Sequence, residues 1–519
     1  MANDLLRIGA ARAVAALDAR EVSSLELTTA LLDRLEQLQI EVRPMASIWR
    51  EDALRAAQSS DLRRRRGAAL SAFDGLPVTL KENLDVRGRE STLGVHAKVG
   101  VPAERDAVVV QVLREAGCVF LGKTNVSQFL LFHECSNPVF GVTRNPYALD
   151  RTPGGSSGGE AAAIAAHGSP GGLGTDIGGS VRVPAHFCGI AGIKPTVDRI
   201  SGLGIGTALP GQEFVRGQVG PMGRSVDDVI TLLRALSPEA CARLDPRVPP
   251  LALGDPAAID FRAIKVGFFV DDGIVAPSLA VQRAVGQAVA ALRDAGAEVV
   301  PYSPPACREI ILTYLAGLSA DGGRTVERQL QGGPGDPNLS VLRTMAKLPS
   351  SVKKAAAFGM SLRHEPMVPD MLRVMGEKSV QTYWELTAKA RALQVRVARA
   401  WTELGLDAVV CPPHATPALP HGASRDFTLG GALSMRYNFV NFPAGVVPVT
   451  RVRAGEAVRH NPVGRLANRA AEVDRGSEGL PVGVQVVARP YKEDLVLALM
   501  KAIESVVAKD PDYPRLDLA

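Results

Sequence analysis

Short runs of consecutive apolar residues alternate along this chain with longer amphipathic segments. The helical periodicity of the amphipathic segments predicts helices at 105–117, 280–295 and 383–405, and a last one that begins near Glu493. Strands that are apolar on both faces belong in a sheet covered on both sides. We therefore expect an α/β fold in which helices cover both faces of a central sheet. The apolar runs predict its strands at 74–81, 118–122, 264–270, 298–300, 407–411, 446–452 and 482–487.

The first residues of the chain predict two helices. Residues 5–19 and 25–38 show helical periodicity, and Ser23-x-x-Glu26 is a capping box at the start of the second helix. We expect residues 1–70 to be an N-terminal helical segment that packs on a main domain formed by residues 71–519.

Two later stretches interrupt the alternation of strands and helices. The Pro-rich stretch 238–256 is typical of a surface connection between two lobes. Residues 303–377 are rich in Gly, Pro and short helical pieces, so we expect a variable helical region there without a defined architecture.

The charge balance argues against a nucleic-acid partner. The 519 residues include 59 Lys and Arg against 54 Asp and Glu, so the net charge of +5 is a small excess. The dense basic block from Arg63 to Arg66 precedes Gly67, and no aromatic residues are interleaved with it as a base-stacking platform requires. We interpret this block as the solvated end of a helix.

The cysteines indicate a reducing compartment, and the hydropathy predicts neither a signal peptide nor a membrane span. No two cysteines form a C-x-x-C pair, so neither a zinc site nor a disulfide framework is predicted. Asp4 and Arg7 stand where a signal peptide would be apolar. No apolar run approaches the roughly 18 residues of a membrane-spanning helix, so we expect a cytoplasmic protein. The cysteines are Cys118, Cys135, Cys188, Cys241, Cys307 and Cys411.

Two glycine-rich loops that carry serine lie close together in the sequence. Residues 154–159 read GGSSGG, residues 178–180 read GGS, and an alanine-rich segment follows the first loop. Glycine lets the backbone turn sharply and brings its N–H groups close to a ligand. A serine on such a loop can reach a carbonyl carbon while backbone donors hold the developing oxyanion. These loops therefore predict an active site.

Two other interpretations of the loops fit the sequence less well. A phosphate-binding loop would need G-x-x-x-x-G-K-[ST], or a G-x-G-x-x-G that opens a helix, and neither occurs there. A nucleophile elbow needs G-x-S-x-G, and Arg182 stands where the last glycine would be. The nearest histidines, His167 and His186, are interpreted as structural.

A serine nucleophile needs a base. Lys81, at the end of an apolar strand, is a candidate if burial keeps its amine neutral. Such an amine could take a proton through an intermediate serine hydroxyl and later return it to a leaving amine. That relay needs three groups in a row, and the sequence offers Lys81, Ser156 and Ser180.

At these positions the chain resembles the amidase signature family. Residues 154–196 are similar to the signature region of that family, and residues 76–88 are similar to its lysine-bearing segment. The intervals of 75 residues from Lys81 to Ser156 and of 24 residues from Ser156 to Ser180 also suit the family. The resemblance implies a central mixed β-sheet, a catalytic domain over residues 71–519 and a Ser–cisSer–Lys triad.

The resemblance assigns a role to each matching residue. Ser180 would be the nucleophile that forms an acyl-enzyme, Ser156 the bridging serine after a cis peptide bond, and Lys81 the terminal base and acid. Lys123 is interpreted as structural, and no metal or organic cofactor is implied. The oxyanion hole would consist of the backbone N–H groups of Ile177, Gly178, Gly179 and Ser180. The residues that brace the loops would be Ser157, Thr175, Asp176 and Arg182.

Further segments resemble the fatty acid amide hydrolase branch of this family. Leu130, Leu131 and Phe132 lie where that branch lines its acyl channel, which implies a hydrophobic acyl pocket for a small-molecule amide. Charged residues interrupt segment 348–375, where the branch has a membrane-docking cap, so peripheral membrane contact and an ordinary pair of surface helices both stay open. A homodimer is common in the family and is expected here. The similar segments are 135–138, 321–324, 383–386, 437–450 and 479–485.

The leading hypothesis is a serine hydrolase that cleaves N-acyl amides. A general aryl or alkyl amidase with urethane or ester activity would carry the same triad and is the first alternative. A glutamine-hydrolysing amidotransferase subunit, which needs partner chains, and an inactive binding module agree less well with the segments named above.

Overall fold

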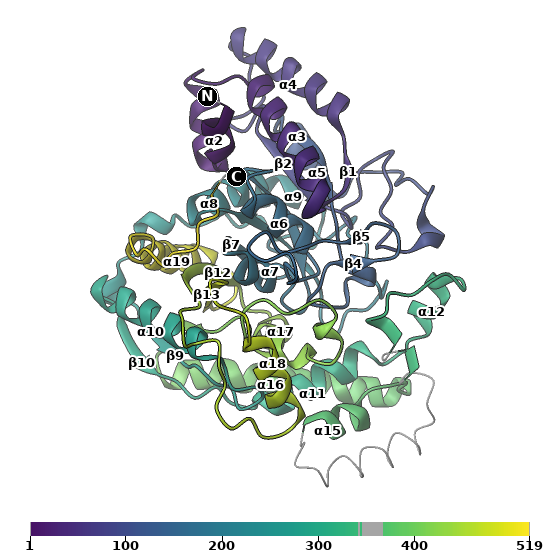
Figure 1. Cartoon of the computed structure of the whole chain (residues 1–519), viewed down its shortest axis with the longest axis vertical. Coiled ribbons are helices and arrows are strands. Elements are labelled where there is room, and N and C mark those ends of the chain that lie inside the picture. The colour runs from purple at the N-terminus through teal and green to yellow at the C-terminus, as the bar shows by residue number, and fades with distance from the viewer. Residues whose placement is uncertain (1, 341–342, 345–366, 518–519) are drawn as a thin grey trace.

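Helices surround one long mixed sheet in the computed structural model, which describes residues 2–340, 343–344 and 367–517 (Figure 1). The strands are β1 Met45–Ile48, β2 Pro77–Lys81, β3 Val119–Thr124, β4 Ser136–Asn137, β5 Gly141–Val142, β6 Gly171–Asp176, β7 Ala191–Lys194, β8 Gln218–Gly223, β9 Lys265–Phe268, β10 Glu298–Pro301, β11 Ala408–Cys411, β12 Ala444–Arg451 and β13 Pro481–Ala488. Eleven of them form one sheet in the order β1-β3-β2-β6-β8-β7-β12-β13-β11-β9-β10, and β4 pairs with β5. Parallel pairs such as β2 with β6 occur beside antiparallel pairs such as β6 with β8. The predicted α/β fold with a central mixed sheet is confirmed.

Helices pack on both faces of this sheet. Neighbouring residues of a strand point to opposite faces, and a Cβ on Gly445 of β12 would meet Met500 of α19, whereas Val446 packs with Ile164 of α6. The helices are α1 Ala2–Arg7, α2 Ala10–Asp18, α3 Ser24–Glu41, α4 Arg50–Arg65, α5 Val108–Glu115, α6 Gly158–Ala165, α7 Arg182–Cys188, α8 Val226–Ala235, α9 Pro238–Leu244, α10 Leu279–Asp294, α11 Cys307–Leu318, α12 Arg324–Leu330, α15 Met367–Val374, α16 Val380–Glu403, α17 Ala432–Phe439, α18 Arg465–Asp474 and α19 Glu493–Val507.

The first predicted helix is divided in two. α1 ends at Arg7 and α2 begins at Ala10, because Asp228 of α8 reaches the break and accepts a hydrogen bond from the Ala11 N–H at 3.0 Å. A Cβ on Gly9 would collide with that carboxylate. The second predicted helix begins with the expected capping box of Ser23 and Glu26. Residues 1–70 also contribute β1, an edge strand of the sheet that the apolar pattern did not predict.

The stretch 238–256 does not separate two lobes. It contains α9 and lies between α8 and β9, and β8, which precedes α8, belongs to the same sheet as β9. The prediction of two lobes was wrong, because proline content indicates a surface connection without indicating whether the sheet continues beyond it.

The basic block at the end of α4 is only partly solvated. Arg64 is buried and donates from Nε to the Asp74 carbonyl at 2.8 Å, while Arg63 forms an ion pair of 2.6 Å with the Asp74 carboxylate. These two arginines fix the loop that leads into β2. Arg65 and Arg66 are exposed, as expected for the whole block.

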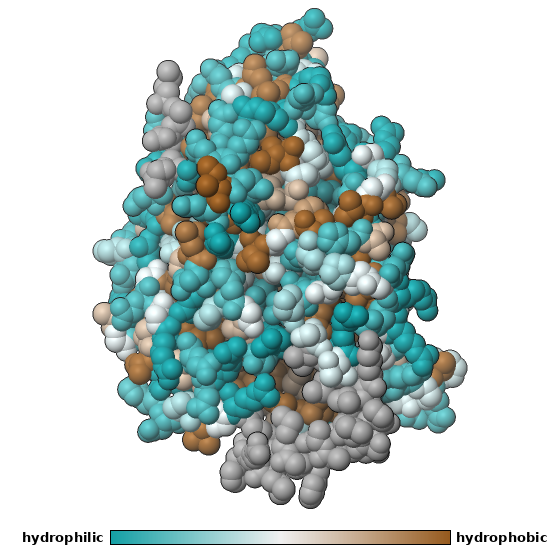
Figure 2. All heavy atoms as spheres, turned by 45° about the vertical axis from the view of Figure 1, so that its right-hand side comes forward, coloured by the Kyte–Doolittle hydropathy of each residue, from teal (hydrophilic) through white to brown (hydrophobic). Residues whose placement is uncertain are grey.

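The outer surface mixes hydrophilic side chains with scattered apolar ones on the face seen in Figure 2. Within the described residues, no helix is long and apolar enough to cross a membrane. Most of segment 348–375, namely 348–366, lies outside the described residues, and α15 covers most of the remainder. All six cysteines are free thiols, and Cys307 alone of them is not fully buried.

Candidate active site

β2, an inner strand of the sheet, ends at Lys81. The strand lies between β3 and β6 and is parallel to both, so its last residue is buried by neighbours on either side. The Lys81 amine donates to the Ser156 hydroxyl at 2.8 Å, to the Thr175 hydroxyl at 2.9 Å and to the Thr175 carbonyl at 3.1 Å. The strand end thus brings the predicted base to the predicted bridging serine.

The surroundings of Lys81 favour a neutral amine. The side chain is fully buried, and among the described residues no carboxylate lies within ion-pair distance of Nζ. Burial lowers the pKa of Lys81 to about 7, against the opposing effect of the Asp176 charge. An amine with this pKa can accept a proton near neutral pH, as a general base must.

The first glycine loop, which carries Ser156, packs against residues 132–134. The peptide bond between Gly155 and Ser156 is cis, as the resemblance implied. A Cβ on Gly155 would collide with the Glu134 and Phe132 carbonyl oxygens, so only glycine permits this approach. The next residue, Ser157, directly precedes α6 and exchanges hydrogen bonds of 3.3 Å with Thr175 of β6.

The second glycine loop follows β6 and leads into α7. Asp176, the last residue of β6, accepts hydrogen bonds from the Gly179 N–H at 2.8 Å and the Val181 N–H at 3.0 Å. The Ser180 carbonyl accepts from the Ser157 N–H at 3.2 Å, which ties the two serine loops together. The structure records no hydrogen bond between the hydroxyls of Ser156 and Ser180, both of which it describes.

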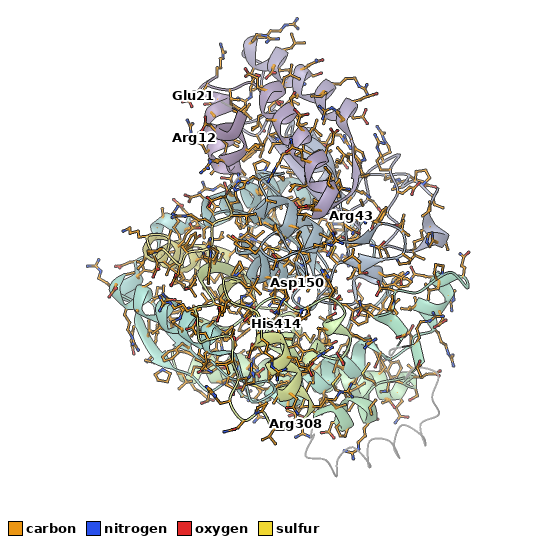
Figure 3. All side chains as sticks on the ribbon, in the orientation of Figure 1. Arg12, Glu21, Arg43, Asp150, Arg308 and His414 are labelled. Carbon is orange, nitrogen blue, oxygen red and sulfur yellow. The ribbon has the colours of Figure 1, made fainter. Side chains whose placement is uncertain are left out.

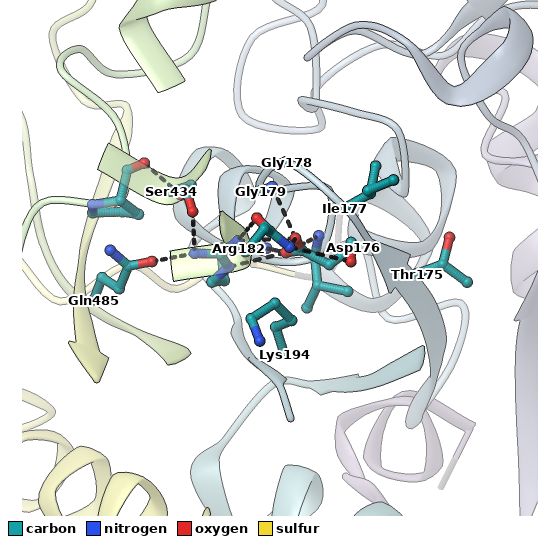
Figure 4. A network of polar contacts seen from close by, with 12 residues as sticks. Thr175, Asp176, Ile177, Gly178, Gly179, Arg182, Lys194, Ser434 and Gln485 are labelled. Atoms are coloured by element: carbon teal, nitrogen blue, oxygen red, sulfur yellow. Dashed lines mark hydrogen bonds and ion pairs between the residues drawn. The ribbon is translucent and has the colours of Figure 1, made fainter. Parts of the chain in front are cut away.

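Arg182 is the centre of a buried network of polar contacts that holds this loop (Figure 4). Its guanidinium forms an ion pair of 2.9 Å with Asp176 and also donates to Asn438 Oδ1 and Gln485 Oε1, both at 2.6 Å. Burial alone would raise the pKa of Asp176, but the Arg182 charge and the bonds from Arg182 and Asn438 hold that pKa well below its usual range. Asp176 is therefore an ionised brace of the loop.

The predicted oxyanion donors are not equivalent. The Gly179 N–H already donates to Asp176 at 2.8 Å, so in this structure a carboxylate holds the predicted donor. Its part in the oxyanion hole stays a prediction. No hydrogen bond is recorded, among the described residues, for the N–H groups of Ile177, Gly178 and Ser180. These three remain free to bind a developing oxyanion.

The predicted substrate residues lie beside the first loop. Phe132 is buried, and its carbonyl faces Gly155. Leu130 and Leu131 are half-buried and pack in one apolar cluster with Phe132, Leu209 and Val326. An apolar surface therefore adjoins the loop that carries Ser156.

Three residues interpreted as structural do make structural bonds. Lys123 is buried and donates to the Glu82 carbonyl at 2.9 Å, away from both serine loops. His167 bonds backbone carbonyls near both chain ends, and His186 bonds the Thr416 carbonyl and accepts from the Gly483 N–H.

Several polar residues of the site escaped the sequence analysis. Asn438 and Gln485 lie in segments that resemble the fatty acid amide hydrolase branch, but no pattern distinguished them from their neighbours. His133 and Tyr314 form hydrogen bonds with the second loop. Both have apolar neighbours in the sequence, so they resemble ordinary buried residues there.

A buried lysine bonded to one loop serine, next to a second serine loop with free backbone donors, is an arrangement typical of serine hydrolases. A sequence model of the Amidase family matches residues 26–497, and the chain belongs to this family. It is therefore an amide hydrolase.

The chain is similar to amide hydrolases and to an amidotransferase subunit. Fatty-acid amide hydrolase 1 of Sus scrofa is 41% identical over 84% of this chain and 76% of its own length. A glutamyl-tRNA(Gln) amidotransferase subunit of Chloroflexus aggregans (strain MD-66 / DSM 9485) is 30% identical over 96% of this chain and 97% of its own length. A solved fatty acid amide hydrolase structure matches 98% of this chain and 86% of its own, with a TM-score of 0.85 at 24% identity, and so shares the fold.

Proposed function

We propose that the chain cleaves carboxylic amides through an acyl-enzyme, with Ser180 as nucleophile, Ser156 as proton bridge and Lys81 as base. The observation that carries this proposal is the 2.8 Å hydrogen bond from the buried Lys81 amine to the Ser156 hydroxyl.

The proposed reaction moves one proton back and forth. In its neutral form the Lys81 amine has two hydrogens and one lone pair, so it donates to the two Thr175 oxygens and accepts from the Ser156 hydroxyl across the same 2.8 Å contact. The amine then takes the Ser156 proton while Ser156 takes that of Ser180, and the Ser180 oxygen attacks the amide carbonyl. The free N–H groups of the loop hold the oxyanion. The proton then returns to the leaving amine, the C–N bond breaks, and water later attacks the acyl-enzyme by the same relay to release the carboxylic acid.

The activity should depend on pH through Lys81. Below its pKa of about 7 the amine is protonated and cannot accept a proton, so kcat/KM for an amide should rise as the pH increases through about 7 and level off above. A pH–rate profile measures this. A profile that is flat through neutral pH would show that Lys81 does not titrate as the base.

We propose hydrophobic N-acyl amides as the substrates. Leu130 and Leu131 are half-buried in one apolar cluster with Phe132, whose carbonyl lies against Gly155 of the Ser156 loop, so this cluster offers an apolar surface for an acyl chain. The relative from Sus scrofa is named a fatty-acid amide hydrolase, which supports the same substrate class. A general aryl or alkyl amidase is the alternative.

Acyl length separates these two substrate classes. Each buried methylene contributes ~0.8 kcal/mol, so kcat/KM should rise at least ~10-fold between acyl chains of about four and ten carbons. The measurement uses anilides of one series below their critical micelle concentrations. Leu131→Gln should flatten the rise, whereas Ile40→Gln, at an exposed position of α3, should not. A flat or falling series in the unchanged protein would favour the general amidase.

An amidotransferase subunit is the second candidate function, supported by the relative from Chloroflexus aggregans. Glutaminase activity that appears only with partner chains would favour it over a free-standing amidase. The expected homodimer and the peripheral membrane contact stay predictions.

A further inference from the structure

Two buried side chains bond to backbone carbonyls of the loop 177–180, hereafter the oxyanion loop. Tyr314 of α11 donates from its hydroxyl to the Ile177 carbonyl at 3.0 Å. His133, which follows the short turn Gln128–Leu130, forms a hydrogen bond of 3.0 Å from Nε2 to the Gly178 carbonyl. The two side chains thus bond to consecutive carbonyls of the loop. Neither side chain belongs to the network of Asp176 and Arg182 described above.

The planar peptide bond makes the direction of each N–H depend on the direction of the carbonyl before it. In a trans peptide the carbonyl and the following N–H point in opposite directions. The Gly178 carbonyl faces His133, and the next N–H, that of Gly179, points away to Asp176 at 2.8 Å. By the same rule, the Ile177 carbonyl at Tyr314 turns the Gly178 N–H away from Tyr314. That N–H is one of the three donors without a recorded partner.

A loop of this composition needs such restraints. Gly178 and Gly179 lack side chains, so their peptide planes rotate easily between conformations that other residues avoid. A flipped Ile177–Gly178 plane would present a carbonyl oxygen where the oxyanion must bind, and two negative oxygens repel each other. A flipped Gly178–Gly179 plane would turn its carbonyl oxygen towards the Asp176 carboxylate, with the same repulsion. Tyr314 fits this restraining position closely, since a Cβ on Gly178 would lie only 2.7 Å from its hydroxyl.

The surroundings of His133 fit the same purpose. A carbonyl only accepts, so Nε2 carries the proton, and burial lowers the pKa of the ring and keeps it neutral. Nδ1 is then a buried acceptor, and none of the described residues bonds to it. The ring packs edge-on against His414, near the middle of the molecule in Figure 3, with 5.9 Å between centroids. The site thus keeps the bond to Gly178 although an unpaired nitrogen costs stability.

We propose that Tyr314 and His133 are positioning residues that fix two consecutive peptide planes of the oxyanion loop. Tyr314 fixes the plane that carries the Gly178 N–H, so that this N–H points at the developing oxyanion. His133 fixes the next plane, whose N–H is held by Asp176, and so keeps the Gly178 backbone in place. This inference rests on the proposed function, in which that loop binds the oxyanion after Ser180 attacks. The two residues touch the loop and not the reacting atoms, so they act on the transition state through the backbone.

Tyr314→Phe tests the first half of the inference. Removing a direct oxyanion donor costs about 100-fold or more in kcat, so loosening one should cost about 10-fold. The loss should fall on kcat with KM nearly unchanged, and should be equal for an amide and its matching ester, because both form the oxyanion. Tyr302→Phe, at a buried tyrosine that accepts from Trp401 away from the loop, is the matched control and should keep full kcat.

A trifluoromethyl ketone with the substrate's acyl chain reports on the oxyanion directly. The Ser180 oxygen adds to its carbonyl carbon, and the carbonyl oxygen becomes the oxyanion. Tyr314→Phe should weaken this inhibitor by the same factor as kcat, and should leave the corresponding alcohol, which has no carbonyl, unaffected. Unchanged ketone affinity in a variant that unfolds at the normal temperature would overturn the role of Tyr314.

Two substitutions of His133 test the second half independently. The side-chain amide nitrogen of glutamine reaches about as far as Nε2 and can donate to the same carbonyl, whereas leucine cannot donate. His133→Gln should therefore retain most of the kcat and ketone affinity, and His133→Leu should lose about as much as Tyr314→Phe. Equal ketone affinity in the two variants would contradict the hydrogen-bond role.

Ser180→Ala keeps this inference separate from the proposed function. If that variant binds the ketone as tightly as the unchanged protein, Ser180 is not the nucleophile and the proposed function fails. If it loses ketone binding while the Tyr314 and His133 variants keep it, the proposed function stands and the positioning roles alone are rejected.

Discussion

Ser180→Ala should abolish amide hydrolysis and covalent labelling by a fluorophosphonate, with kcat falling by about 10³-fold or more. The alanine lacks the oxygen that attacks the carbonyl, and no other described hydroxyl stands on the oxyanion loop. The fold should persist, because the bond of this residue to Ser157 uses the backbone carbonyl. Turnover of an acyl anilide, labelling by mass spectrometry and the thermal unfolding temperature together give the result.

Ser59→Ala is the control for that experiment. Ser59 lies exposed on α4, and its loss should leave both turnover and labelling unchanged. Near-normal amide hydrolysis by the Ser180 variant would contradict the whole assignment of the nucleophile, whichever acyl group the enzyme prefers.

Lys81→Ala should slow amide hydrolysis far more than hydrolysis of the matching ester. Proton transfer by a positioned group contributes about 10²- to 10⁴-fold, and an amine leaving group must receive a proton whereas an alkoxide leaves more readily. We expect the amide rate to fall across that range and the ester rate to fall at least about 10-fold less. The ratio of kcat/KM for the two substrates measures the acid role of Lys81.

Lys123→Met is the matched control, because Lys123 is a second buried lysine on a neighbouring strand. Its amine bonds the Glu82 carbonyl and no serine of the two loops, and burial lowers its pKa to about 8. Its loss should lower the unfolding temperature and leave the ratio of amide to ester rates unchanged. Equal losses on both substrates in the Lys81 variant would remove Lys81 from the acid role.

Much of the sheet was predictable because its central strands are apolar on both faces. β11 and β13 begin and end within one residue of the predicted runs 407–411 and 482–487. β6 was not predicted, since its sequence GGLGTD has the composition of a loop. The neighbours β2 and β8 supply the hydrogen bonds that make it a strand, and they are distant in the sequence.

Tertiary contacts also decided where helices break and which side chains are buried. The break before α2 depends on Asp228, more than 200 residues away, and the burial of Arg64 depends on the loop around Asp74. Residue periodicity carries no information about such partners, because it reflects only the neighbours of a residue along its own element.

The sequence by itself determined the chemical groups of the site: two serines on glycine loops and a lysine at the end of an apolar strand. Local composition can do this, because glycine and an apolar strand constrain the backbone wherever they occur. Only the tertiary structure decided that the Gly179 N–H is already bound and that Tyr314 and His133 grip the neighbouring carbonyls. The direction of a peptide plane depends on partners brought together by folding, and those partners come from segments that the chain keeps far apart.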